Sequence, residues 1–397
     1  MKDQNIPDGW QIVKFGEIAK QISKRIEPSE TDLNIYIGLE HLDPGSLKIN
    51  RHGVPGDVKG QKLLVKKGQI IFGKRRAYQR KVAIAGFDCI CSAHAMVLEA
   101  NTDKIVTDFL PFFIQSDEFM NRAVAISEGS LSPTIKWKVL ANQEFMIPSL
   151  EKQEASVEVL RGITNDLEHI ELALESAYNL KQSVLANFLL KGIGNKSFID
   201  SKFGSYPENW QLVTVGDLTL EHKQGFYTTE KYAAEGCYLV RISDLDNPRV
   251  IFDEMPRLKV DTKTIEQFKV EKGDFLFARS GTIGRYGIYD SEEEAIFASY
   301  VIRFRFNEKK ILTSYFGYFY ESILCARQLR GIAQQGSNVN INAENIKKLK
   351  VPLPSIDEQK EILKIINEVE LSIEKLNNKI ETTKILVKSL SQEMIGG

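Results

Sequence analysis

The stretch GQIIFGKRR, residues 68–76, has a glycine and lysine spacing close to that of a nucleotide-binding loop. In the pattern G-x-x-x-x-G-K-[ST], backbone N–H groups bind phosphate and the final hydroxyl binds Mg²⁺. Gly68, Gly73 and Lys74 stand at the required spacing, but Arg75 occupies the hydroxyl position. Taken alone, the stretch leaves three interpretations open: a degenerate ATP site, a phosphate-binding site of another kind, or a chance match.

The cysteines and histidines do not have the spacing of a metal site. Cys89, Cys91, Cys237 and Cys325 form no C-x-x-C pair, and no histidine lies at zinc-ligand spacing from them. The histidines are scattered along the chain without an H-E-x-x-H pattern. We therefore expect reduced thiols and no protein metal site.

Motifs of the DNA-modifying enzymes are also missing from the sequence. An adenine methyltransferase needs an [ND]-P-P-[YFW] loop, whereas this chain contains no Pro-Pro step and comes nearest with DNPR at 246–249. No glycine-rich cofactor loop follows a strand and opens a helix. The sequence therefore disfavours a methyltransferase or a P-loop ATPase, and we expect a non-catalytic chain that binds no cofactor itself.

The formal net charge is −1, but charges are unevenly distributed along the chain. Residues 62–81 hold eight Lys or Arg and no acid, whereas residues 151–181 hold seven Asp or Glu against three Lys or Arg. Local patches, rather than the total charge, attract nucleic acid. The first segment is thus a candidate DNA-binding surface, and the second is a candidate surface for docking a protein.

Length and apolar patterning limit the class of protein. A chain of 397 residues is expected to form two or more domains. No apolar run approaches the roughly 20 residues of a membrane span, and the first 20 residues contain no apolar signal-peptide region. We therefore expect a cytoplasmic protein with no membrane partner.

Three pairs of segments indicate an internal repeat. Their offset grows from 200 to 206 residues, as a few insertions in the second copy would produce. The pairs are PDGWQIVKFGEI (7–18) with PENWQLVTVGDL (207–218), VKKGQIIFGKRRAYQRKVAI (65–84) with VEKGDFLFARSGTIGRYGIY (270–289), and FMIPSLEKQ (145–153) with VPLPSIDEQ (351–359). The chain is therefore a tandem duplication of a unit of roughly 200 residues.

The repeat changes the interpretation of GQIIFGKRR. Its counterpart reads GDFLFARS, in which Ala278 and Arg279 replace Gly73 and Lys74. A phosphate loop would have lost its defining residues in the second copy. We interpret the segment as a turn, an apolar strand and the start of a loop whose cations face phosphate, most simply that of DNA.

Each copy combines a mixed globular part with a long helix. Strand-like runs such as GQIIF and GDFLFA precede short helical segments, and a Pro-Ser step then leads into SLEKQ or SIDEQ, which have the pattern of a helix N-cap followed by acids. We predict an α/β (α+β) fold with globular domains at 1–148 and 196–353. Helical spacer regions are predicted at 149–195 and 354–397.

Both predicted helices carry apolar residues alternately three and four positions apart over about four heptads, the pattern of a coiled coil. Because a whole domain separates them in sequence, an antiparallel pair is the simplest arrangement. The stripe from 160 to 188 spans on the order of 40–45 Å, which suits two DNA sites roughly one helical turn apart or somewhat more. The predicted coiled-coil contacts are Leu160, Ile163, Leu167, Ile170, Leu174, Val184 and Phe188, and Ile366, Val369, Ile373, Leu376, Ile380, Val387 and Leu390.

The turn after each apolar strand has the side chains of a DNA reader. Phosphate contacts supply affinity and base contacts supply specificity, and Arg and Gln pair bidentately with guanine and adenine. A solvated basic loop is the alternative. The candidates are Lys74, Arg75, Arg76, Tyr78, Gln79, Arg80 and Lys81 in the first copy, and Arg279, Ser280, Thr282, Arg285 and Tyr286 in the second.

A second candidate DNA-binding strip precedes each long helix, in SEGSLSPTIKWK (127–138) and AQQGSNVNINAEN (333–345). Short polar side chains around a glycine suit a loop that lies on a DNA backbone or in a groove, although a plain polar connector has the same composition. The candidates are Ser130, Ser132 and Lys136, and Gln334, Gln335, Ser337, Asn338 and Asn340.

Along its whole length the chain resembles the specificity (S) subunit of type I restriction–modification systems. The resemblance rests on the order domain, helix, domain, helix, and on P-x-x-W-x-x-V-x-x-G-[DE] at the start of each copy. It also rests on KGDFLFARSGTIGR in the second domain and PLPSIDEQKEIL at the second helix. KKGQIIFGKRRAYQRK departs from the usual form of the first of these two motifs.

The resemblance implies a non-catalytic subunit with two target-recognition domains, each reading half of a split DNA target. GSLKINRHGVPGDVKGQKLL and NPRVIFDEMPRLKVDTKTIE differ strongly, so the two halves are expected to differ and the target to be asymmetric. The family further implies two methyltransferase (modification) subunits docked along the helices, with restriction subunits joining the complex. S-adenosylmethionine, ATP and Mg are then expected on those partners. A DNA-modifying enzyme and a protein-binding coiled-coil scaffold remain the alternatives.

Overall fold

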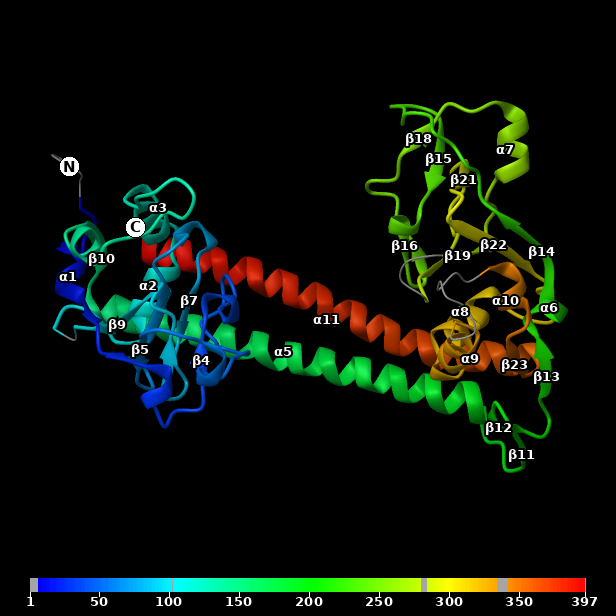
Figure 1. Cartoon of the computed structure of the whole chain (residues 1–397), viewed down its shortest axis with the longest axis horizontal. Helices are drawn as coiled ribbons and strands as arrows, with labels where there is room; N and C mark the ends of the chain where they lie inside the picture. The colour runs from blue at the N-terminus through cyan, green and yellow to red at the C-terminus, as the bar shows by residue number, and fades with distance from the viewer. Residues whose placement is uncertain (1–5, 102, 280–283, 334–341, 397) are drawn as a thin grey trace. The chain divides into compact units, whose positions relative to one another are not determined.

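The computed structural model describes residues 6–101, 103–279, 284–333 and 342–396, which form two compact units (Figure 1). Unit 1 consists of Met1–Leu172 together with Asn378–Gly397, and unit 2 consists of Ala173–Asn377. Each long helix therefore contributes one part to each unit.

The centre of unit 1 is a four-stranded antiparallel sheet that is buried on both faces. On the strand β6 (Ile70–Gly73), Ile70 and Phe72 face one apolar core, whereas Ile71 faces another. Because successive side chains point to opposite faces of a strand, a run of apolar residues is needed to fill both cores. The strand order is β2 (Ala19–Ile22), β9 (Ala95–Ala100), β6 (Ile70–Gly73) and β7 (Val82–Ile84).

Further strands and short helices cover this sheet. A second sheet has the order β3 (Arg25–Ile26), β5 (Lys62–Val65), β8 (Cys89–Cys91) and β4 (Tyr36–Ile37), and β1 (Trp10–Lys14) pairs with β10 (Glu144–Pro148). The short helices are α1 (Phe15–Ile18), α2 (Phe109–Gln115), α3 (Asp117–Ala125) and α4 (Trp137–Leu140).

Unit 2 repeats this frame in the same order. Its central sheet is β14 (Thr219–Gln224), β22 (Val301–Phe306), β19 (Phe275–Ala278) and β20 (Tyr286–Ile288), and β13 (Gln211–Thr214) pairs with β23 (Lys350–Leu353). A further sheet joins β18 (Arg257–Leu258), β15 (Cys237–Val240) and β21 (Ala295–Phe297). In both units the further sheet contains one parallel pair, β4 with β8 and β15 with β21.

The remaining described elements of unit 2 lie around this frame. Two hairpins are formed by β11 (Phe198–Ser201) with β12 (Gly204–Pro207) and by β16 (Leu245–Asp246) with β17 (Arg249–Val250). The short helices are α6 (Val215–Leu218), α7 (Thr262–Phe268), α8 (Thr313–Glu321), α9 (Ile323–Ala333) and α10 (Ala343–Lys347).

The two long helices are α5 (Leu150–Lys191), with 42 residues, and α11 (Ile356–Gly396), with 41. In unit 1, Leu160 near the start of α5 shares a core with Leu390 and Ile395 near the end of α11. In unit 2, Leu189 near the end of α5 shares a core with Ile362 near the start of α11. The helices are therefore antiparallel within each unit, as the sequence predicted. All the predicted coiled-coil positions are buried or half-buried.

A buried glutamine anchors the first turn of each long helix to its own unit. The Gln153 side-chain amide donates to the Pro148 carbonyl at 2.8 Å and its oxygen accepts from the Val106 amide at 2.8 Å. Gln359 donates to the Lys310 carbonyl at 2.9 Å and accepts from the Leu312 amide at 2.9 Å. Both glutamines are 0 % exposed. The hydroxyls of the preceding serines accept from helix amides in the cap position, as SLEKQ and SIDEQ indicated.

Candidate nucleic-acid interface

The predicted basic turn of unit 1 joins β6 to β7. Within it, residues Ala77–Gln79 form a single 3₁₀ turn, and Arg76 and Arg80 on either side have φ angles of 56° and 54°. Non-glycine residues seldom adopt this left-handed conformation, and it concentrates at functional sites when the surrounding structure enforces it. The turn therefore has a specific conformation rather than that of an unconstrained basic loop.

The two predicted strips of unit 1 lie against one another. The Arg76 amide donates to the Pro133 carbonyl at 2.7 Å, and the Ile135 amide donates to the Lys74 carbonyl at 3.0 Å. The Arg76 guanidinium also donates to the Ser132 hydroxyl at 3.3 Å. Residues more than fifty positions apart in sequence thus form one polar surface, which the sequence could not establish.

The predicted DNA-binding residues of this surface differ in their surroundings. Arg76 is exposed, as are Tyr78, Ser130 and Lys136, whereas Lys74, Arg75, Gln79, Arg80, Lys81 and Ser132 are half-buried. The Arg80 guanidinium pairs with Asp117 and donates to the Gln115 carbonyl at 3.1 Å. Lys81 donates to the Leu39 carbonyl at 2.7 Å, and Lys136 pairs with Glu128 at 2.6 Å. Burial, followed by the charge of Arg25, lowers the pKa of Lys74.

In unit 2 the predicted contact by Tyr286 is wrong. Tyr286 lies on β20 with its side chain 0 % exposed. Its ring stacks on Phe275 at a centroid distance of 5.0 Å, and its hydroxyl donates to Glu321 at 2.8 Å. Arg279 and Arg285 are half-buried. The other candidates of unit 2, namely Ser280, Thr282, Gln334, Gln335, Ser337, Asn338 and Asn340, lie outside the described residues.

The segment GQIIFGKRR does not form a nucleotide-binding loop, despite its glycine and lysine spacing. The residues between Gly68 and Lys74 include β6, whose backbone pairs with β9 and β7. Its N–H groups therefore bond to neighbouring strands rather than encircle a phosphate. The described residues contain no group of three or more His, Cys, Asp or Glu placed to hold a metal ion. All four cysteines are buried free thiols.

Sequence reasoning did not select the turn that precedes β9 or β22, where His94 and Tyr300 are exposed. His94 contacts the basic turn directly, since its Nε2 atom lies 3.0 Å from the Arg75 guanidinium. A single histidine or tyrosine between two strands carries no spacing signal, so only the pairing of strands reveals its position.

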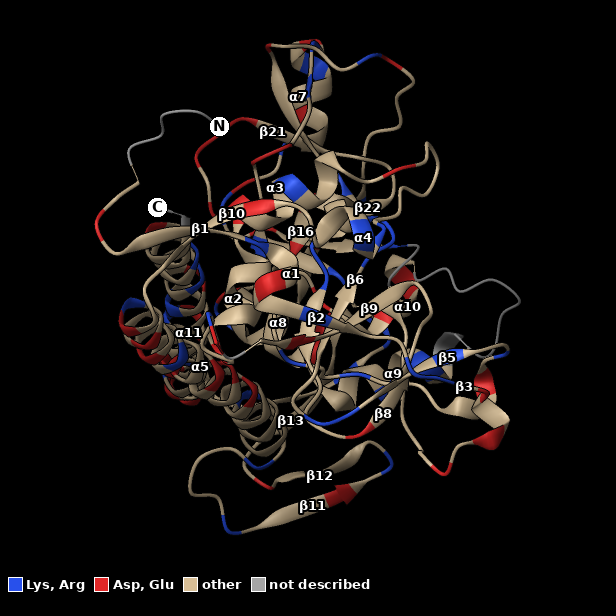
Figure 2. Cartoon of the chain, turned by 90° about the vertical axis from the view of Figure 1, so that its left-hand side faces the viewer, with Lys and Arg blue, Asp and Glu red and all other residues tan. Residues whose placement is uncertain are grey.

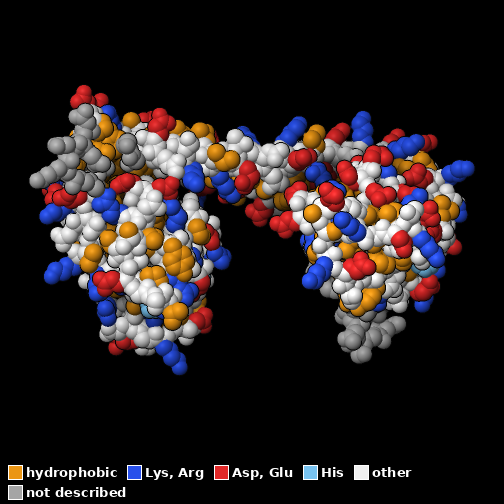
Figure 3. Space-filling view, turned by 90° about the horizontal axis from the view of Figure 1, so that it is seen from above, with side chains coloured by type: hydrophobic (Ala, Val, Ile, Leu, Met, Phe, Trp, Pro, Cys, Tyr) orange, Lys and Arg blue, Asp and Glu red, His pale blue; other side chains and the backbone are white. Residues whose placement is uncertain are grey.

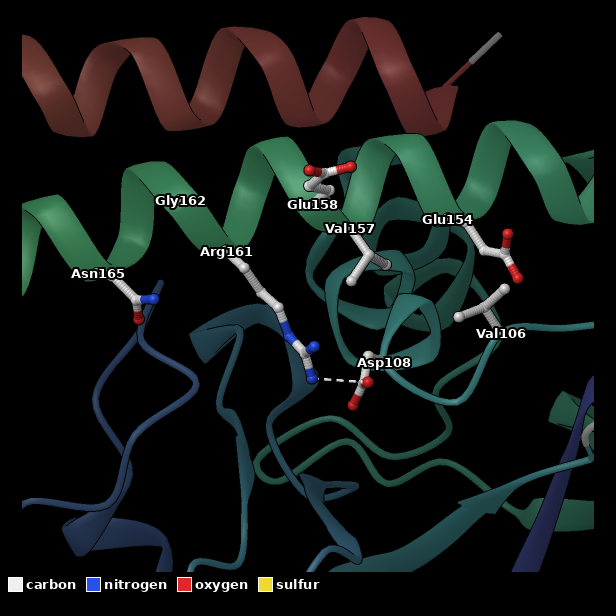
Figure 4. Close-up of a pocket in the computed structure, with 8 residues that line it drawn as sticks. All are labelled: Val106, Asp108, Glu154, Val157, Glu158, Arg161, Gly162 and Asn165. Atoms are coloured by element: carbon white, nitrogen blue, oxygen red, sulfur yellow. Dashed lines mark ion pairs between the residues drawn. The ribbon is translucent and has the colours of Figure 1, made fainter.

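A shallow groove of about 450 Å³ lies beside α5 in unit 1 (Figure 4). Its apolar part is formed by Val106 and Val157, and Arg161 reaches from the helix to Asp108 on the facing segment, 2.6 Å away. The remaining lining residues are Glu154, Glu158, Gly162 and Asn165. The groove is open and acidic, which fits a protein surface better than a small-molecule site.

Charged and apolar side chains are intermixed on the chain surface. Acidic positions recur along α5 (Figure 2), and on the face drawn in Figure 3 apolar side chains lie among charged groups of both signs. Exposed apolar side chains on the long helices include Leu180, Leu371 and Ile385.

None of the described helices combines the length and apolar character needed to cross a membrane.

Comparison with known proteins places the two repeats in one family. The sequence model of the type I restriction modification DNA specificity domain matches residues 7–175 and again residues 207–382. The MjaVIII specificity subunit of a type I restriction enzyme from Methanocaldococcus jannaschii is 23% identical, over 98% of this chain and 96% of that protein. The StySPI specificity subunit of Salmonella potsdam is 20% identical, over 100% of this chain and 89% of that protein.

Solved structures show the same fold. A structure from a study of complex assembly and conformational transition of the type I R-M system matches with a TM-score of 0.64 at 17% identity, over 99% of this chain and 98% of that one. The S subunit of a type I restriction–modification system from M. genitalium matches with a TM-score of 0.57 at 14% identity, over 99% and 97%. The chain belongs to the family of type I restriction–modification specificity subunits, and it carries the DNA specificity domain of that family twice.

Proposed function

We propose that this chain is the non-catalytic DNA reader of a type I restriction–modification complex. Each repeat reads one half of a bipartite target through the surface that follows β6 or β19. The observation that carries the proposal is the contrast between a common strand frame and different side chains at its DNA-reading loops. Because the loops differ, the two half-sites differ and the target is asymmetric.

The long helices serve as the spacer and as the docking surface for two methyltransferase subunits. Their exposed apolar residues and the acidic groove beside α5 support this role, because exposed apolar patches with polar rims mark protein interfaces. Restriction subunits join through the assembled complex. S-adenosylmethionine, ATP and Mg are bound by those partners, and this chain neither methylates DNA nor hydrolyses ATP.

Exchange of one repeat tests the assignment of readers to half-sites. Residues 1–148 are replaced by the corresponding domain of another specificity subunit, and the methylated motif is mapped in DNA exposed to the assembled complex. We expect only one half of the motif to change. A matched exchange of residues 196–353 should change only the other half. A change in both halves after either exchange would contradict the two-reader assignment.

A further inference from the structure

The same tight turn leads into the central sheet of each repeat. In unit 1 the turn spans residues 92–95 between β8 and β9, and the Ala95 amide donates to the Ser92 carbonyl at 2.9 Å. In unit 2 the turn spans residues 298–301 between β21 and β22, and the Val301 amide donates to the Ala298 carbonyl at 2.8 Å. The two turns are therefore closed by equivalent backbone bonds.

The third residue of each turn is joined to an arginine that follows the neighbouring strand. The Arg75 amide donates to the His94 carbonyl at 3.2 Å, and the Arg279 amide donates to the Tyr300 carbonyl at 3.0 Å. These bonds involve only backbone atoms, so they are independent of the side chain at the turn. His94 and Tyr300 therefore occupy equivalent backbone positions in the two repeats.

Both side chains are presented to solvent. Tyr300 is 60 % exposed and His94 is also exposed. The third turn position contributes little to either core, so packing does not require a histidine in one repeat and a tyrosine in the other. An exposed aromatic residue beside an arginine is instead a common arrangement at nucleic-acid surfaces.

The two side chains offer different hydrogen-bonding groups. Arg75 can only donate, so the His94 Nε2 atom 3.0 Å from its guanidinium accepts, and the neutral ring carries its proton on Nδ1. Burial, and then the charges of Arg75, Lys74 and Lys62, lower the pKa of His94, which favours this neutral form. The free groups of the His94–Arg75 pair are therefore N–H donors. Tyr300 has a hydroxyl that both donates and accepts, and a ring that can contact a thymine methyl.

We propose that His94 and Tyr300 are equivalent specificity-determining residues, each contacting base edges in one half of the DNA target. This inference rests on the proposed DNA-reading function. His94 with Arg75 presents donors, which match the two major-groove acceptors of guanine. Tyr300 with Arg279 presents a mixed donor and acceptor set, so the second half-site is selected by different bases at the corresponding position.

Reciprocal substitution tests the proposal in the full chain assembled with its methyltransferase subunits. The variants H94Y and Y300H are used to select bound sequences from a pool of DNA with randomised target positions. We expect H94Y to change base preference only in the half read by unit 1, and Y300H only in the half read by unit 2. The expected change is roughly ten-fold at one base position, as for one base contact.

Controls separate this inference from the function on which it rests. Phe198, an exposed aromatic residue on β11, supplies the variant F198H, which should leave both half-sites unchanged. If a reciprocal variant does not assemble, Y300F and H94Q replace it, because they change fewer groups. Unaltered preferences in variants that still bind specifically would overturn the role of His94 and Tyr300. A wild-type complex without sequence preference would overturn the proposed function itself.

Discussion

Arg76 and Arg80 belong to the same turn and share a left-handed backbone conformation, yet their side chains have different partners. The Arg80 guanidinium is held by Asp117 and the Gln115 carbonyl. Arg76 is exposed, and within the part of the chain that the structure describes its side chain bonds only the Ser132 hydroxyl. A charge count treats the two as equal, but the contacts assign Arg80 to the fold of unit 1 and leave the Arg76 side chain accessible for the proposed phosphate contact.

Substitution of these arginines should separate DNA binding from stability. We expect R76E to weaken DNA binding by the assembled complex and to lower the slope of log affinity against log salt by about 1, because one phosphate contact is lost. R80A should instead lower the free energy of unfolding by about 1 kcal/mol. Salt titrations and urea unfolding measure the two effects. K309E, at an exposed position of unit 2, is the charge control, and an equal loss of affinity in this variant would reject a specific role for Arg76.

The effect of Arg80 on stability should depend on pH. A hydrogen bond from Gln392, opposed by partial burial and aided by Arg80, lowers the pKa of Asp117 below its ordinary value of 3.8. A lowered carboxyl pKa means that the folded state favours the carboxylate, so this contribution is present above pH 3.8 and is lost as the pH falls below it. The difference in stability between R80A and the wild type should therefore shrink in acid.

At the scale of elements, features set by local sequence patterns could be predicted, whereas features set by tertiary contacts could not. The heptad stripes on α5 and α11 were predictable because the spacing of residues on a helix is a local property. Tyr286 was misassigned because its alignment with a basic loop did not show that it lies on β20, facing the core. The turns that carry His94 and Tyr300 were missed because only strand pairing brings them beside an arginine.

The buried glutamines offer a test of how the long helices are anchored. We expect Q153A to lower the free energy of unfolding of unit 1, and Q359A that of unit 2, by about 1–3 kcal/mol, since each leaves buried backbone groups without a partner. Hydrogen exchange followed on individual peptides measures the stability of each unit separately. Q182A changes an exposed glutamine on α5 and should have no comparable effect. Equal destabilisation by Q182A would contradict anchoring by the two buried glutamines, because alanine favours a helix at least as well as glutamine.

Two corresponding positions near the helix starts carry opposite charge in the two repeats. Glu154 and Glu158 line the groove in unit 1, whereas the positions 206 residues later hold Lys360 and Lys364, which are exposed. If identical methyltransferase subunits dock on both helices, the two sites cannot use the same ion pairs. We expect the double charge reversal of Glu154 and Glu158 to Lys to weaken one docking site about ten-fold and leave the other unchanged.

Native mass spectrometry of the assembled complex, titrated with methyltransferase subunit, measures this asymmetry. The matched variant reverses Lys360 and Lys364 to Glu and should affect only the opposite site. Equal effects of both variants on both sites would show that these residues act through overall charge rather than through separate contacts.

For the whole molecule, the decisive feature is that unit 1 is assembled from distant parts of the chain. Ile395, near the end of α11, is 0 % exposed in the same core as Phe15 and Leu160. We expect I395A to lower the stability of unit 1 by about 2–5 kcal/mol, the usual cost of a large-to-small change in a core. I385A removes a side chain that is 69 % exposed on the same helix and should cost far less. If I395A accelerated hydrogen exchange only in unit 2, that result would contradict this core assignment.

This discontinuity also has a consequence for synthesis on the ribosome. Unit 2 is continuous from Ala173 to Asn377, whereas unit 1 needs residues from Asn378 onward. At about 5–20 residues per second, roughly 10–40 s separate translation of the first part of unit 1 from that of the segment that completes its core. During that interval the apolar side of the newly made α5 has no α11 to cover it. The half of the molecule that is made first is therefore the half that finishes folding last.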